Sequence, residues 1–275
     1  MRIALSILPF ALMAAPALAR QGAPADPAGP PAANRGSSAA GEFVTGVEYQ
    51  EGEYFTGERV EILTVQNEAR LRLGRTTFSA SLPWHRIEAP ANVIGGGGIF
   101  GLPIIVDPTQ PTTRARRSGI GDLRLGVAQA LPSVAGVELT LSGQVKLPTA
   151  SAARGIGTGE TDVAVGAELT RSFGPVTPFV SVAYTMPGDP EAYDLRNSLT
   201  ARGGVSLQLG RSLRGNLSYG VAQGVSPQVP DERQVSMGLN ASVSRSLSLG
   251  LYGNAGLSNG APDVAAGVSL GFRIF

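Results

Sequence analysis

His85 is the only histidine in the sequence, and it follows Trp84 near the end of an apolar segment. A hydrolytic enzyme would need this imidazole beside a nucleophile and a third, orienting group. The next residues, "RIEAPAN", supply no recognisable nucleophile element, so we expect that the protein is not an enzyme. An interfacial aromatic residue followed by a polar one is ordinary at the end of a membrane-spanning strand. A membrane-embedded hydrolase therefore stays a minor alternative.

Two further motifs lie in the long segment 88–118. The run "GGGGIFG" contains G-x-G-x-x-G, but a dinucleotide site needs that motif between a strand and a helix, and Pro103 with β-rich residues follows it instead. We expect no cofactor and no metal site. The segment is also apolar, which predicts that Ile94, Ile99 and Phe100 fold inward as a constriction or lie on a rim. A hairpin that extends a wall above the membrane is the alternative.

The run "RARR", Arg114 to Arg117, falls in the same expected loop. Arginine guanidinium groups could bind lipopolysaccharide phosphates through charge-assisted hydrogen bonds. A solvated loop surface is the simpler interpretation, because short charge clusters are usually exposed to water.

The elements that must position these residues are strands. From Phe43 onward, apolar residues alternate with small, polar or charged ones, which is the period of a strand with two different faces. No stretch after residue 43 shows a convincing helical period. The pattern predicts about twelve strands: 43–51, 59–73, 76–87, 119–131, 135–147, 159–172, 176–186, 195–209, 212–223, 232–244, 246–256 and 263–275.

Composition excludes several classes of protein. The 275 residues include no cysteine, which rules out disulfides, zinc thiolates and cysteine nucleophiles. A formal net charge of +1 argues against a nucleic-acid partner, which would need a concentrated basic face. No apolar run long enough for a membrane helix occurs beyond the N-terminus.

The N-terminus predicts export. Arg2 precedes an apolar stretch that ends at "ALA", so residues 1–19 read as a signal peptide cleaved after Ala19. A membrane anchor is the alternative, but the apolar stretch is short for one. Residues 20–41 are rich in Pro, Ala, Gly and Ser and predict a flexible tether, followed by a folded region at 42–275.

The breaks between strands alternate between tight turns and longer connections. Short turns at one end and long loops at the other are typical of an outer-membrane barrel, and an even strand number places both termini at the short-turn end. A soluble sandwich could show the same period, but it would rarely need a dozen strands of this length with sorted turns. The expected fold is therefore an all-β, transmembrane antiparallel β-barrel of about twelve strands.

The polar faces of these strands carry charges of both signs. A ring of one sign would predict ion selectivity, whereas a mixture predicts weak selectivity or a narrow, salt-bridged interior. The residues expected to line the lumen are Arg70, Arg72, Asp122, Arg124, Glu138, Lys146, Asp162, Glu168, Arg202 and Arg214, with Glu68 beside them.

Several segments resemble a known family. "SLPWHR" (81–86), "GIGDLRLGVAQALP" (119–132), "VKLPT" (145–149), "GTGETDVAVGAELTRSFG" (157–174) and the terminal "GFRIF" are similar to the outer-membrane transporters of the phenol meta-pathway (MetA-pathway of phenol degradation) type. In that family a G-x-G-D turn opens a strand that reads L-x-L-G. Here Ala150 stands where the family tends to have Gly. The resemblance covers most of residues 43–275.

The resemblance implies passive uptake of small hydrophobic or aromatic solutes across the outer membrane of a Gram-negative bacterium. The expected partners are outer-membrane lipid, lipopolysaccharide, a small-molecule solute, and the barrel-assembly machinery through the last strand ending at Phe275. In that strand Arg273, Gly271 and Ser269 occupy the row that is apolar in most assembly signals. The alternative from another class is a structural or surface-interaction barrel with an occluded lumen.

Overall fold

The computed structural model describes residues 39–54, 57–94, 105–107, 110 and 112–275. Within these ranges there are strands and one short 3-10 helix, and no helix long and apolar enough to cross a membrane. The elements are β1 (Ala40–Gly52), β2 (Val60–Leu73), β3 (Thr76–Ser81), β4 (Trp84–Pro90), β5 (Val93–Ile94), β6 (Ile105–Val106), β7 (Arg114–Ile120), β8 (Leu123–Ala130), β9 (Val137–Leu147), η1 (Ala152–Arg154), β10 (Asp162–Arg171), β11 (Val176–Met186), β12 (Ser198–Gln208), β13 (Leu213–Ala222), β14 (Glu232–Ser242), β15 (Leu247–Gly256) and β16 (Val264–Arg273).

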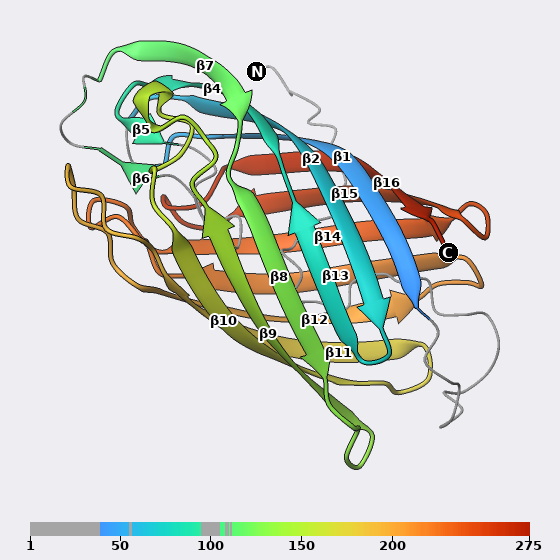
Figure 1. Cartoon of the computed structure of the whole chain (residues 1–275). Coiled ribbons are helices and arrows are strands. Elements are labelled where there is room, and N and C mark those ends of the chain that lie inside the picture. The colour runs from blue at the N-terminus through green and yellow to red at the C-terminus, as the bar shows by residue number, and fades with distance from the viewer. Residues whose placement is uncertain (1–38, 55–56, 95–104, 108–109, 111) are drawn as a thin grey trace.

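The long strands form one antiparallel sheet that closes on itself as a barrel (Figure 1). Strand β1 pairs with β2 on one side and with the last strand, β16, on the other, in a register that runs from Glu42↔Arg273 to Glu51↔Val264. The ladder continues past β16, because the amide of Ile274 donates to the carbonyl of Gly41 at 2.8 Å. Closure satisfies the edge groups that an open sheet would leave unpaired in lipid.

Two of the predicted strands are interrupted. Both β3 and β4 pair with β2, while β8 pairs with β3 and β7 pairs with β4. The fourteen strands of the sheet therefore make twelve wall strands, and the predicted twelve-stranded antiparallel barrel is confirmed. The break has a local cause, since Pro83 has no amide to donate and its carbonyl accepts a bond from Gly121 at 2.8 Å.

One boundary predicted from the sequence is wrong. Residues Arg114 to Arg117 were expected in a loop, but they lie in β7, which pairs with β4 from Trp84↔Ile120 to Pro90↔Arg114. The strand signal is weak there because the outward row of β7 carries arginines instead of aliphatic residues. The two ends of the expected loop 88–118 therefore belong to wall strands, since β4 continues to Pro90 and β7 begins at Arg114. The short β5–β6 hairpin lies between them.

The apolar rows of the strands face outward. Their large side chains are exposed around the barrel, for example Val165 at 50%, Val180 at 49% and Leu217 at 48%. The alternate rows face the interior, where Ala164 and Ala183 are buried. An apolar outer belt with a polar inner surface is the pattern of a barrel that spans a membrane.

The connections separate into two kinds. One end of the barrel, here called the short-turn end, has the tight turns and also holds β1's first residue and Phe275. The other, the long-loop end, holds the connections of 53–59, 91–113, 148–161, 187–197, 223–231 and 257–263. The expected signal peptide (1–19) and most of the expected tether lie outside the described residues, and β1 begins at Ala40, inside the range expected for the tether.

Candidate functional site: the barrel interior and its mouth

A buried charged cluster lies on the inner wall near the long-loop end. The side chain of Lys146 (β9) is 0% exposed, and its Nζ is 2.9 Å from Asp162 Oδ2 (β10) and 3.3 Å from Asp122 Oδ2, just before β8. The same Nζ donates to Thr158 Oγ1 at 3.1 Å. One buried cation thus satisfies two carboxylates, which is the arrangement that makes buried charges tolerable.

Both carboxylates of this cluster also hold loops of the long-loop end. Asp122 Oδ1 accepts the amide of Ala150 at 2.9 Å, at the start of the 148–161 connection. Asp162 Oδ1 accepts the amide of Gly188 at 3.1 Å, in the 187–197 connection. The cluster therefore joins three wall strands to two loops.

A second group of charges lies nearer the short-turn end of β2. Arg70 contacts Glu68 at 2.7 Å and Glu42 at 3.7 Å, so it joins two neighbouring strands. Arg124 is buried between this group and the Lys146 cluster, within reach of the charges of Asp122, Asp162 and Glu68. The inner wall beneath the mouth thus carries neighbouring charges of both signs.

The other residues expected in the lumen are spread around the barrel. Arg202 on β12 lies within the field of Glu168 on β10 and of Glu232 on β14. Arg214 contacts the side-chain oxygen of Gln208 at 3.2 Å. Arg72 and Glu138 are partly exposed near the short-turn end and lie outside the Lys146 cluster. Whether this surface lines a solute path is part of the proposal below.

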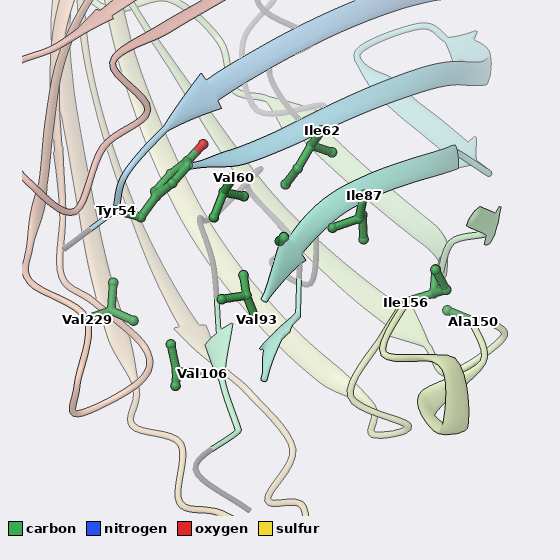
Figure 2. Close-up of a cluster of buried hydrophobic side chains, with 10 residues drawn as sticks. Tyr54, Val60, Ile62, Ile87, Val93, Val106, Ala150, Ile156 and Val229 are labelled. Carbon is green, nitrogen blue, oxygen red and sulfur yellow. The ribbon is translucent and has the colours of Figure 1, made fainter. Parts of the chain in front are cut away.

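Apolar side chains form a buried cluster at the long-loop end of the barrel (Figure 2). They come from the inner faces of β2 and β4, from the β5–β6 hairpin and from three loops, and all are buried: Tyr54, Val60, Ile62, Ile87, Ala89, Val93, Val106, Ala150, Ile156 and Val229. Burial of this apolar area stabilises the inward position of the loops, at about 25 cal/mol per Å². Burial also raises the pKa of Tyr54, so its hydroxyl stays protonated.

The β5–β6 hairpin reaches across the mouth. Val93 and Val106 belong to the cluster on the β2–β4 wall, whereas Ile94 and Ile105 pack with Ala222 and Val225, against which Tyr193 and Leu195 also pack. In the ring of twelve wall strands, β3/β4 is the third and β13 the ninth, so the hairpin packs with residues from opposite sides of the barrel. The 223–231 connection contributes Val229 to the first cluster and Val225 to the second. Of the three residues predicted to form a constriction, Ile94 lies in this bridge, and Ile99 and Phe100 lie outside the described residues.

Arg117 holds the start of this hairpin, a role that the sequence did not indicate, since the run 114–117 was expected in a loop as a candidate phosphate contact. Its guanidinium donates to the carbonyls of Ala91 (3.0 Å), Pro90 (3.4 Å) and Val93. If β7 had been recognised as a strand, its alternation would have placed Arg117 on the inward face. Glu232 is a second buried interior charge that was not predicted, although it begins an expected strand.

The lone histidine is buried on the inner face of β4. His85 Nδ1 is 3.0 Å from Thr64 Oγ1 on the paired strand β2. A hydroxyl at that nitrogen is an ordinary cross-strand hydrogen bond, and a hydrolytic triad would need a further orienting group. Among the described residues, no group of three or more His, Cys, Asp or Glu side chains could hold a metal ion.

No protein-family model matches the sequence, and no curated protein matches it. Solved structures do. An outer membrane channel from Pseudomonas putida F1 aligns over 90% of this chain and 100% of that chain, with a TM-score of 0.66 and 13% identity. NanC porin aligns over 84% and 100% (TM-score 0.53, 9% identity), and KdgM porin over 85% and 99% (TM-score 0.52, 5% identity). At these identities the likeness establishes the fold, which is the β-barrel of outer-membrane channels and porins.

Proposed function

We propose that the protein is a passive channel in the outer membrane of a Gram-negative bacterium. The observation that carries this proposal is the closed twelve-stranded barrel whose outer rows are apolar and whose inner rows are charged. Twelve strands give a width between side-chain-filled eight-stranded barrels and wide porins, which suits small solutes. The likeness to outer-membrane channels and porins supports the same role.

The solute class we propose is small hydrophobic or aromatic compounds. Support comes from the resemblance of "GIGDLRLGVAQALP" and the neighbouring motifs to phenol meta-pathway transporters. The described interior carries charges of both signs, and Arg70 and Lys146 are neutralised there by ion pairs. Such a mixture gives little selectivity for ions of one sign, which favours uncharged solutes.

A barrel with an occluded lumen is the second candidate, and one observation favours it. The β5–β6 hairpin links opposite walls at the mouth through two buried apolar clusters. In the proposed channel solute passes beside this hairpin or displaces it, whereas in an occluded barrel the hairpin helps to close the mouth. The two candidates therefore differ in what happens when the hairpin is removed.

The test is planar-bilayer conductance of refolded residues 20–275, compared with a deletion of residues 93–106. The deletion joins Asn92 to Asp107, which are already adjacent because the Asp107 amide donates to the Asn92 carbonyl at 2.8 Å. We expect discrete steps from the full protein and larger or more frequent steps from the deletion. Gly210→Ala, in a turn at the other end with open space around it, is the matched control.

The outcomes separate the candidates. Silence from the folded full protein with steps from the deletion would make the barrel a closed one, opened only by removing the hairpin. Silence from both would refute the channel. If steps occur, liposome-swelling rates for an aromatic solute and a sugar of equal size test the solute class, and equal rates would contradict it. Lipid hydrolysis abolished by His85→Ala would instead reveal an enzyme.

A further inference from the structure

A cluster of charged side chains faces outward on four neighbouring wall strands, a third of the barrel, at the long-loop end. It comprises Glu51 (β1), Arg59 and Glu61 (before and on β2), Arg86 and Glu88 (β4), and Arg114 and Arg116 (β7). We call these seven residues the charged ridge. Their side chains share the outward face with the apolar belt, so they do not line the proposed channel.

The ridge begins abruptly above the apolar belt. Strand register aligns Val47, Val65, Trp84 and Ile120 in one cross-strand row, all apolar. The next outward row holds Tyr49, Leu63, Arg86 and Ser118, and the row after it holds Glu51, Glu61, Glu88 and Arg116. Outward rows are two residues, or roughly 6.6 Å, apart along a strand. The outer surface therefore changes from apolar to fully charged within two rows.

Ion pairs link the ridge across four strands. Arg59 contacts Glu51 and Glu61, Arg86 and Arg116 both contact Glu88 (2.7 and 3.3 Å), and Arg114 lies 3.9 Å from Glu61. The arginines stay accessible, with side-chain exposures of 62% for Arg116 and 58% for Arg59. Pairs this exposed contribute little to stability, about 0–1 kcal/mol each, so stability alone gives little reason for them.

The outward residues near the long-loop end of β11 to β16 carry little charge. Most of them are neutral: Met186, Leu199, Val221, Val235, Ala255 and Val264. Arg233, the outward residue next to Val235 on β14, is the exception in this region. The charged ridge is therefore a local feature of β1, β2, β4 and β7.

We propose that the charged ridge binds the phosphate groups of the glycolipid that forms the outer leaflet around the barrel. The inference rests on the proposed outer-membrane location, but it concerns a lipid contact and not transport. A surface directly above the apolar belt meets the lipid headgroups, and arginine presents a fork of donors that matches phosphate oxygens. Four arginines against three glutamates leave a net positive charge for an anionic ligand. The glutamates position the arginines while the lipid is absent.

The test is binding of diphosphorylated lipid A to the purified full-length protein in detergent, measured by native mass spectrometry. The variant Arg59→Gln/Arg114→Gln/Arg116→Gln should weaken binding about tenfold, as the product of three exposed charge contacts of about twofold each. Arg233→Gln, an exposed outward arginine outside the ridge, is the matched control and should bind as the wild type does. Lipid A without phosphates should bind the wild type and the triple variant equally.

A second variant reverses the sign of the effect. Glu88→Gln removes the carboxylate that contacts both Arg86 and Arg116, so affinity for diphosphorylated lipid A should rise. If the triple variant does not fold, the binding of lipid A by Glu88→Gln tests the proposal by itself. Unchanged affinity in both variants would overturn the proposal, as would equal binding of phosphorylated and phosphate-free lipid A. Complete displacement by inorganic phosphate would also overturn it, because the ridge would then recognise phosphate without the lipid. None of these measurements requires conductance.

Discussion

Replacing Lys146 by methionine should release two loops from the barrel wall. Methionine is of similar length but has no charge, so Asp122 and Asp162 would lose their shared cation. Removing one partner of a buried ion pair costs about 3–5 kcal/mol. We expect the lower end, about 3 kcal/mol, because Arg124 lies near both carboxylates and offsets part of the loss.

The loss should be local. The closed backbone ladder holds the wall together without Lys146, whereas the 148–161 and 187–197 connections each depend on an amide bonded to one of these aspartates. Hydrogen exchange at the amides of Ala150 and Gly188 is therefore the assay. A change of about 3 kcal/mol in the opening free energy corresponds to exchange about a hundredfold faster.

Arg72→Met is the matched control, since Arg72 is an inward cation on β2 near the short-turn end and lies outside the cluster. It should leave both amides as protected as in the wild type. If the amides of Ala150 and Gly188 exchanged at wild-type rates in Lys146→Met, the ion pairs of Lys146 with Asp122 and Asp162 would not be what holds these loops. That result would refute the reasoning.

Two further predictions concern the seam where the barrel closes. A Cβ at Gly267 would lie 2.6 Å from the ring of Tyr252, so Gly267→Ala should cost about 1–3 kcal/mol and lower the temperature at which the folded barrel loses its heat-modifiable mobility in gels. Gly210→Ala, with open space around it, is the control, and an equal shift in both would contradict the packing argument. Phe275 is 62% exposed and lies over Gly41, so Phe275→Ala should change refolded stability by less than about 1 kcal/mol yet reduce the amount assembled in cells. If Phe275→Ala reached wild-type amounts in the outer-membrane fraction, the expected role of Phe275 in assembly would be contradicted.

Much of the barrel wall could be predicted, because the alternation of residue types along a strand shows which side chains face outward and which face the interior. Val163, Val165 and Leu169 alternate with Asp162 and Glu168, and the pleat alone sends these two sets to opposite faces. Lipid outside and charge inside select the register, since a slip of one residue would exchange the faces. The twelve wall strands and their order follow from this local pattern and from the sorted turns.

The interior could not be predicted in the same way, because its contacts join residues far apart in the chain. The sequence alone determined that Asp122, Lys146 and Asp162 face inward, but only the paired strands brought them to one point. Likewise, the apolar character of segment 88–118 was evident, while its crossing from the β4 wall to the β13 wall was not. Alternation is a property of neighbouring residues and is readable from the chain. Which loop meets which wall depends on barrel closure, and the tertiary structure alone decided it.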